Sequence, residues 1–406
     1  MAAITRFRAL RPAPAAAAPV AAVPYDVVNA EEARALASDN PLSFLHVSRA
    51  EIDLPQGTNP YADVVYTKAV ENFAMLKTRA PLVLEDAPSL YLYRLRMGQH
   101  VQTGVAGCFS VAEYEADIIK RHERTRRDKE DDRTRHIIEL RAQTGPVFLT
   151  HRASPGVDTV VRRSFGGSAP LLDFAASDGV QHTIWRVDAK DQRDLVAAFE
   201  ATPVLYIADG HHRAASAARA RHHFRGGGGA AGEWDTFLAV AFPADQVQIL
   251  PYNRLVKDLG ALTPDSLLAA VRQCVDVRKG PAMPARKGDV AMFLAGAWHT
   301  IELGTPPSSA GAAEQLDVNR LHDLVLAPLL GIGDVRTDTR IEFVGGARGT
   351  AQLETLVSSG QAAVAFSMYP VSVADLMAIS DAGGIMPPKS TWFEPKLRDG
   401  LLSHMI

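Results

Sequence analysis

A continuous apolar run, Pro203-Val-Leu-Tyr-Ile-Ala-Asp209, passes through Gly210 into an alanine-rich segment that extends from Ala214 to Phe224. An apolar run of this length without polar alternation is typical of a strand that is buried on both faces. Alanine has the highest helix propensity, so the segment after the glycine is expected to be a helix. A buried strand followed at once by a helix requires a sheet covered by helices, and the chain is therefore predicted to have an α/β fold.

Strand and helix patterns also alternate on both sides of this unit. Short strands are expected before residue 112, helical and strand patterns mix in 113–259, and 260–406 combines a predicted hairpin at 290–302 with several helices. These changes in pattern predict three regions, 1–112, 113–259 and 260–406, in a mixed α+β architecture. The last region ends in a proline-rich loop that is a candidate to return to the functional site.

Composition narrows the classes of function. The 406 residues carry a formal net charge of -3, which provides no general attraction to nucleic acid or to anionic membranes. Cys108 and Cys274 are far apart and show no paired spacing, so neither a disulfide framework nor a zinc knuckle is expected. No window reaches the roughly 18 apolar residues of a spanning helix. A cytoplasmic protein without a membrane or nucleic-acid partner is therefore expected.

The residues at the strand-to-helix turn, Asp209-Gly210-His211-His212-Arg213, are suited to holding a phosphate. Glycine permits a close approach of the backbone, the first turn of a helix presents unpaired N–H groups, and Arg213 can add a charged fork. Asp209 could hold a divalent cation against the phosphate, and either histidine could donate a hydrogen bond or a proton. The alternative is that Asp209 only caps the helix and that the histidines are solvated.

A highly charged segment precedes this turn in the sequence. The pattern from Glu113 to Arg141 predicts a helix, on which Glu123 and Arg127 are neighbours at i and i+4. One interpretation is a solvent-exposed helix face with many ion pairs. The other is that basic residues contact phosphate while Glu123 serves as general base for a hydroxyl group. The charges alone do not decide between the two.

Two further segments are candidates for ligand contacts. Lys389-Ser390-Thr391, with Lys396 nearby, combines the cations and hydroxyl donors found at phosphate sites. No Gly-x-x-x-x-Gly precedes the lysine, so the segment is not a P-loop, and an ordinary surface loop is the alternative. Tyr25-Asp26 follows Val23-Pro24 and is expected to form a turn. Neither a nucleophile elbow nor a His-Glu-x-x-His zinc helix is recognisable.

Five segments in this order resemble the domain-of-unknown-function family numbered 1015, which is sometimes labelled ParB-like. The matching segments are Val23-Pro-Tyr-Asp-Val-Val28, His122-Glu-Arg-Thr125 with Lys129 and Asp132-Arg133, Ile207-Ala-Asp-Gly-His-His-Arg213, Ile249-Leu-Pro-Tyr-Asn-Arg254 and Met386-Pro-Pro-Lys-Ser-Thr-Trp-Phe393. They are distributed over nearly the whole chain. The family resemblance by itself implies little about a substrate.

A more distant similarity implies a mechanism. A His-Glu element followed by Asp-Gly-His-x-Arg before a helix is similar to the ParB/sulfiredoxin-type fold and, within it, to the free-serine kinases. This similarity implies a ParB/sulfiredoxin-like core in 113–259, with N-terminal and C-terminal α/β elaborations. It also implies that Glu123 is the base toward a hydroxyl group, and that Asp209, His211 and Arg213 contact nucleotide phosphates or Mg²⁺. The section from 145 to 202 has no clear counterpart in those small kinases.

Together these features predict a nucleotide-dependent phosphotransferase that uses Mg²⁺ with ATP or ADP and acts on a small hydroxyl-bearing molecule, such as serine. One alternative is a ParB-like regulatory module that binds or hydrolyses nucleotide. Another is a metal-dependent phosphohydrolase built on Asp209, His211 and His212. The predicted site has catalytic, phosphate-binding and substrate-contacting residues. The catalytic residues are Glu123, Asp209 (also the metal ligand) and His211, the phosphate-binding residues are Gly210, His212, Arg213, Lys389 and Ser390, and the substrate contacts are His122, Tyr25 and Asp26.

Overall fold

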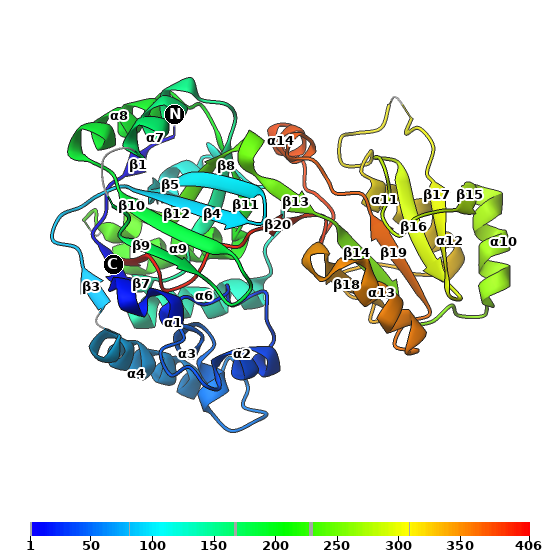
Figure 1. The fold of residues 1–406 in the computed structure, drawn as a ribbon, viewed down its shortest axis with the longest axis horizontal. Coiled ribbons are helices and arrows are strands. Elements are labelled where there is room, and N and C mark those ends of the chain that lie inside the picture. Colours follow the sequence, from blue (N-terminus) through cyan, green and yellow to red (C-terminus); the bar gives the residue numbers. More distant parts are fainter. Residues whose placement is uncertain (1, 81, 166–168, 227–229, 308) are drawn as a thin grey trace. The chain divides into compact units, whose positions relative to one another are not determined.

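The computed structural model describes residues 2–80, 82–165, 169–226, 230–307 and 309–406. The chain divides into two compact units, whose elements are labelled in Figure 1. The first contains Met1–Val247 and Pro395–Ile406, and the second contains Gln248–Glu394. Both combine helices with sheets, so the predicted mixed α/β fold is confirmed. None of the helices in the described part of the chain combines the length and the apolar character needed to cross a bilayer.

The largest sheet of the first unit has nine strands within the described residues. Their bounds are β1 (Ile4–Thr5), β4 (Tyr91–Met97), β5 (His100–Ser110), β6 (Ile119–Lys120), β8 (Val147–His151), β9 (Leu172–Ala175), β10 (Gln181–Arg186), β11 (Leu205–Asp209) and β12 (Thr236–Pro243). The spatial order is β6-β11-β8-β12-β5-β4-β10-β9, and β1 pairs with β5. β11 is parallel to β6 but antiparallel to β8, so its carboxyl end lies beside the beginning of β8.

Helices flank this sheet and bury its main core. They are α5 (Val111–Glu115), α6 (Arg127–Leu140), α7 (Pro155–Ser164), α8 (Ala189–Glu200) and α9 (His211–Arg225). α7 packs against α8, and α6 packs against α9. Leu149 and Ile207 of the sheet share a buried core with Ala214 and Ala218 of α9. Because alanine side chains are short, α9 packs closely on the sheet, which holds its first turn in a defined position.

A second layer of the first unit combines N-terminal helices with a small sheet (Figure 1, blue helices). The helices are α1 (Ala17–Val20), α2 (Ala30–Ala37), α3 (Leu45–Ser48) and α4 (Asp63–Arg79). The sheet has the order β3-β2-β21-β7. Its bounds are β2 (Ala9–Pro12), β3 (Leu82–Leu84), β7 (Ala142–Gln143) and β21 (Ser403–Met405). Phe44, Phe73 and Leu76 lie in the core of this layer, and β21 attaches the C-terminal segment to it.

The second unit contains a sheet with six strands in its described residues. In spatial order they are β15 (Asp276–Lys279), β17 (Ala297–Glu302), β16 (Asp289–Leu294), β19 (Val364–Met368), β14 (Tyr252–Val256) and β18 (Ile341–Gly345). A separate ribbon pairs β13 (Gln248–Leu250) with β20 (Trp392–Glu394). The helices are α10 (Pro264–Cys274), α11 (Asp317–Leu321), α12 (Ala327–Leu330), α13 (Gly349–Ser358) and α14 (Val373–Asp381). The antiparallel pairing of β16 with β17 confirms the hairpin predicted at 290–302.

The prediction of a continuous helix from Glu113 to Arg141 is wrong. The segment forms α5, the short strand β6, a loop at 121–126 and then α6. Ile118 and Ile119 are β-branched and therefore suit a strand, and β6 pairs with the edge of β11. This tertiary pairing outweighs the charged, helix-like pattern around it. His122 and Glu123 consequently lie on a loop beside the end of β11.

The compact units also differ from the three regions expected from the sequence. β5 lies before the expected boundary at 112 and β12 lies after it, yet these two strands are paired neighbours in one sheet. The expected boundary at 259 falls inside the second unit, which begins at Gln248. Local patterns do not report pairing between distant strands, and this pairing decides which segments belong to one unit.

Candidate functional site

The strand-to-helix turn has the local structure predicted from the sequence. β11 ends at Asp209 and α9 begins at His211, with Gly210 between them in the left-handed region at φ 91° and ψ 30°. Gly210 is the N-cap, and no side chain in the described part of the chain caps α9 there. The alternative in which Asp209 only caps the helix therefore does not fit. The first N–H groups of a helix lack partners within the helix and can bind an anion.

Gly210→Ala should lower the free energy of unfolding by about 1–2 kcal/mol through the left-handed backbone alone. A Cβ at this position would also lie 2.9 Å from Nε of Arg213, which adds a steric conflict. Denaturant titration followed by circular dichroism measures the loss. Gly179→Ala is the matched control, because Gly179 has φ 81° and a Cβ there would meet nothing within 4 Å. Equal losses in the two variants would contradict the conflict with Arg213.

The parallel pairing of β6 with β11 brings His122 and Glu123 to His211. The backbone N–H of His122 donates to Nε2 of His211 at 3.4 Å, and the two rings lie edge to face with centroids 4.4 Å apart. Nδ1 of His211 lies 3.8 Å from Oε2 of Glu123. Because Nε2 accepts a hydrogen bond, a neutral His211 ring carries its proton on Nδ1, facing the carboxylate. The structure thus brings these three predicted site residues close together.

Burial keeps both histidines uncharged near neutral pH. Burial lowers the pKa of His122 to about 4, and it lowers the pKa of His211 well below its ordinary value. The side chains are 2% and 4% exposed, whereas that of Glu123 is 41% exposed. Glu123 thus has a neutral imidazole on one side and is partly exposed to solvent.

Asp209 lies between two cations. Its Oδ2 is 3.4 Å from Nζ of Lys396 and 3.4 Å from Nη2 of Arg213. Burial by itself would raise the pKa of Asp209, but the charges of Lys396 and Arg213 outweigh burial and lower it far below the usual range. The sequence associated Lys396 with the C-terminal loop, and the structure places it at the turn. The carboxylate of Asp209 thus orients two cationic side chains of the kind that bind phosphate.

A small cavity of about 40 Å³ lies next to Arg213. Tyr25, Arg133 and Asp399 line it together with Arg213, and the guanidinium of Arg133 lies 4.3 Å from the centre of the Tyr25 ring. Burial raises the pKa of Asp399 to about 7, although the positive charge of Arg213 opposes the shift. Sequence reasoning missed Asp399, because no motif contains it. An antiparallel backbone bridge between Ala22 and Asp399 holds Asp399 beside the cavity.

Asp26 lies close enough to these groups to influence their ionisation. Burial would lower the pKa of Arg213, and the negative charges of Asp26 and Asp209 raise it instead. Burial likewise lowers the pKa of His212, while Asp26 opposes that shift. Tyr25 is buried and Asp26 is exposed, so the turn presents a carboxylate at the surface beside Arg213.

A family profile described as "Protein of unknown function (DUF1015)" matches residues 4–319, which is more than half of the chain. The matched range contains His122, Glu123 and the whole turn from Asp209 to Arg213. The chain belongs to the DUF1015 family. The resemblance found in the sequence is thereby confirmed for this part of the DUF1015 protein. No curated protein matches the chain.

Several solved structures resemble the DUF1015 chain at low sequence identity. A free serine kinase in complex with AMP is 12% identical, covers 73% of this chain and 92% of its own, and has a TM-score of 0.35. SbnI with a C-terminal truncation, from Staphylococcus aureus, is 12% identical over 74% of this chain and 87% of its own, with a TM-score of 0.39. A conserved hypothetical protein from Pyrococcus furiosus is 13% identical, covers 74% of this chain and 95% of its own, and has a TM-score of 0.35. These TM-scores are low, so the chemistry of the DUF1015 site must be derived from its own residues.

Lys389 and Ser390 of this DUF1015 protein belong to the second unit. The hydroxyl of Ser390 donates to the carbonyl of Pro387 at 2.6 Å, and Nη2 of Arg254 donates to the carbonyl of Lys389 at 3.1 Å. Nζ of Lys389 lies 5.6 Å from the centre of the Tyr252 ring. Their predicted contact with phosphate stays a prediction.

The three residues expected for a phosphohydrolase do not form a metal cluster in the DUF1015 structure. Asp209 faces Lys396 and Arg213, and Nε2 of His212 accepts a hydrogen bond from the backbone N–H of Arg126 at 3.0 Å. The arrangement of Asp209, His211 and His212 therefore gives no support to that alternative.

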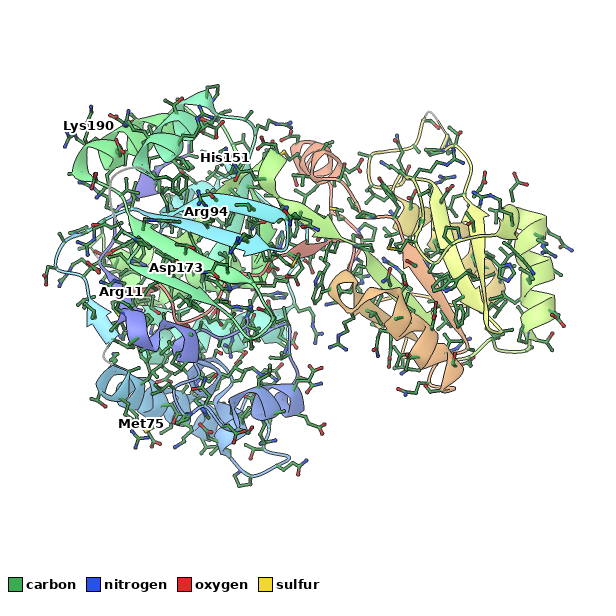
Figure 2. All side chains as sticks on the ribbon, in the orientation of Figure 1. Arg11, Met75, Arg94, His151, Asp173 and Lys190 are labelled. Carbon is green, nitrogen blue, oxygen red and sulfur yellow. The ribbon has the colours of Figure 1, made fainter. Side chains whose placement is uncertain are left out.

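A separate hollow of about 350 Å³ lies at the other end of β8 from Asp209. Arg94 and His151, both labelled in Figure 2, are among its lining residues. Nδ1 of His151 donates to the carbonyl of Arg152 at 2.8 Å. None of the residues predicted from the DUF1015 motifs lines this hollow.

Proposed function

We propose that this protein is a nucleotide-dependent phosphotransferase whose acceptor is a hydroxyl group of a small molecule. The observation that carries the proposal is the position of Glu123. Its half-exposed carboxylate lies 3.8 Å from His211, the first residue of a helix whose opening turn also holds Arg213. A candidate base and a candidate phosphate-binding turn are thus adjacent, which is what phosphate transfer to a hydroxyl requires.

The phosphate of the nucleotide would bind at the start of α9. The first N–H groups of the helix, together with Arg213 and Lys396, provide donors and positive charge. Asp209 holds both cations, so they are already oriented before a ligand arrives. Such preorganised groups stabilise the charge of a transferring phosphoryl group without further rearrangement.

Glu123 would accept the proton of the acceptor hydroxyl. In this step the acceptor oxygen forms its bond to phosphorus, the bond from phosphorus to the nucleotide oxygen breaks, and the proton passes to the carboxylate. The neutral ring of His211 lies beside Glu123, with Nδ1 3.8 Å from the carboxylate. His122, Tyr25 and Asp26 are the proposed contacts to the rest of the acceptor.

Mg²⁺ with ATP or ADP is the proposed cofactor. A carboxylate oxygen and phosphate oxygens are suitable ligands for Mg²⁺, which would neutralise charge on the phosphates when bound. Asp209 is the proposed protein ligand. Because its Oδ2 already faces Lys396 and Arg213, we expect Mg²⁺ to bind only together with nucleotide.

The proposal is tested by incubating the full chain and Mg²⁺ with ATP or ADP, in the presence and absence of serine, threonine and homoserine. The expected product is a phosphorylated acceptor, detected by mass spectrometry. Nucleotide hydrolysis that is independent of every acceptor would instead support the regulatory module. Phosphate release from a phosphomonoester without nucleotide would support a phosphohydrolase. Binding of no nucleotide would contradict both the phosphotransferase and the regulatory module.

Arg213→Ala should weaken nucleotide binding by about 1.5–3 kcal/mol, the range for a hydrogen bond to a charged group. Isothermal titration calorimetry with ADP and Mg²⁺ measures this change. Arg219→Ala is the matched control, because Arg219 lies on the same helix, is 38% exposed and pairs with Glu130 and Asp131. Thermal melts establish that both variants are folded. Unchanged ADP affinity in folded Arg213→Ala would contradict the proposed phosphate site.

A further inference from the structure

His122, Glu123 and His211 form a group with the spacing of metal ligands. Each offers one nitrogen or oxygen atom, and these three atoms all lie within 4.8 Å of one another. The residues come from two segments, the loop after β6 and the first turn of α9, which the sheet holds side by side. Among the described residues, no other group of three or more histidine, cysteine or acidic side chains has such spacing.

His122 provides a second and independent observation. Its side chain is 2% exposed, and neither ring nitrogen forms a hydrogen bond of good geometry in the described part of the chain, although the backbone of Ile207 is near enough to raise the pKa of the ring slightly. A buried polar group without a partner is costly, and such groups are rare in folded proteins. A ligand that accepts a nitrogen lone pair at this position would remove the cost.

We propose that His122, Glu123 and His211 bind one divalent transition-metal ion of the Zn²⁺ type. Two imidazoles and a carboxylate suit Zn²⁺, Fe²⁺ or Co²⁺, whereas Mg²⁺ and Ca²⁺ prefer oxygen ligands alone. Three protein ligands leave at least one coordination position for water or a substrate atom. This site differs from the Mg²⁺ position proposed at Asp209 in both its residues and its chemistry.

The protonation states and the mobility of the residues allow such a site. A neutral imidazole has one nitrogen with a lone pair, and His211 must shift its proton from Nδ1 to Nε2 to bind through Nδ1. With a proton on Nε2, His211 no longer accepts the hydrogen bond from the backbone N–H of His122. This bond is already long at 3.4 Å. Ligand atoms around tetrahedral Zn²⁺ are about 3.4 Å apart, given bonds of about 2.1 Å. The exposed side chain of Glu123 can move inward to reach this separation.

Metal binding at this site has a consequence for catalysis, which rests on the proposed function. A Glu123 carboxylate that coordinates a metal ion cannot accept the proton of an acceptor hydroxyl. The metal ion and the base role therefore exclude each other. We expect Zn²⁺ to inhibit phosphate transfer at concentrations that fill the site, and a chelator to restore it.

The test uses the metal-free full chain without nucleotide. Titration with Co²⁺, followed by visible absorption, and with Zn²⁺, followed by calorimetry, should show one bound ion per chain, while Mg²⁺ alone should not bind. Glu123→Gln should weaken Zn²⁺ binding by more than 10-fold. Even loss of a residue that only hydrogen-bonds to a metal ligand lowers metal affinity by about 10–100-fold, and Glu123 is proposed as a ligand itself. Glu115→Gln is the matched control, since Glu115 forms an exposed pair with His222 at 2.9 Å. This control should leave Zn²⁺ binding unchanged.

Absence of binding to the wild-type chain would overturn the proposal, as would equal weakening in Glu123→Gln and Glu115→Gln. Glu123→Gln is the deciding variant because its side chain is half-exposed, whereas a change at buried His122 could prevent folding. The binding assay contains no nucleotide, so the two proposals fail separately. An active phosphotransferase that binds no Zn²⁺ overturns only the metal site, and a chain that binds Zn²⁺ but transfers no phosphate overturns only the proposed function.

Discussion

Glu123→Gln should lower the rate of phosphate transfer by about 10²–10⁴-fold while nucleotide affinity stays near that of the wild type. Glutamine keeps the size of the side chain and an oxygen that can face Nδ1 of His211, which is 3.8 Å from the carboxylate in the wild type. It cannot take a proton from the acceptor. The nucleotide would contact Arg213, Lys396 and the start of α9, and none of these changes. This variant should therefore lose catalytic rate while it keeps its nucleotide affinity.

Single-turnover measurements with saturating nucleotide and acceptor give the rate, and calorimetry gives the affinity. Glu115→Gln again serves as the control, because it changes a glutamate that pairs with a histidine outside the candidate site. If Glu123→Gln transferred phosphate at the wild-type rate, Glu123 would not be the base. Acceptor-free hydrolysis that persisted unchanged in the variant, with no transfer in either protein, would favour the regulatory module.

Asp209→Asn should impair both nucleotide binding and turnover, and it should also destabilise the fold. The variant leaves Lys396 and Arg213, which are 9% exposed, without their shared carboxylate. Breaking a buried ion pair costs about 3–5 kcal/mol, and we expect about 3 kcal/mol because 26% of the Asp209 side chain is exposed. Loss of the proposed Mg²⁺ ligand would lower phosphate affinity and transition-state stabilisation together.

The same ion pairs predict a pH dependence. The pKa of Asp209 is depressed in the folded protein, so its contribution to stability is present above its ordinary value of 3.8 and is lost as pH falls below that value. Urea titrations between pH 7 and pH 3 should show a smaller loss of stability in Asp209→Asn than in the wild type. A parallel decline in both proteins would contradict the role assigned to Lys396 and Arg213.

Asp235→Asn separates the effect on stability from the effect on function. Asp235 also joins two cations, with Oδ1 2.8 Å from Nε of Arg221 and 2.8 Å from Nε of Arg225, and its side chain is 19% exposed. The control should lose stability but keep its nucleotide affinity. If both aspartate variants reduced nucleotide affinity equally, the loss in Asp209→Asn would be a general consequence of destabilisation and not of a ligand role.

The local structure of the site could be predicted from adjacent residues. The apolar run up to Asp209, the glycine and the alanine-rich segment each have a strong intrinsic preference, for strand, for positive φ and for helix respectively. These preferences act over a few residues and agree with one another. The turn, with Arg213 in the first turn of the helix, is therefore present both in the prediction and in the structure.

The partners of that turn were decided only by the tertiary structure. The helix expected through His122 and Glu123 gave way to β6, because pairing with β11 offers backbone hydrogen bonds and burial that a local charge pattern cannot report. Lys396 and Asp399 reach the site because the C-terminal segment returns to the first unit, where β21 pairs with β2 and Asp399 with Ala22. The sequence by itself thus determined the phosphate-type turn. Long-range strand pairing determined which carboxylates, histidines and cations surround it, since those contacts join residues that no local preference connects.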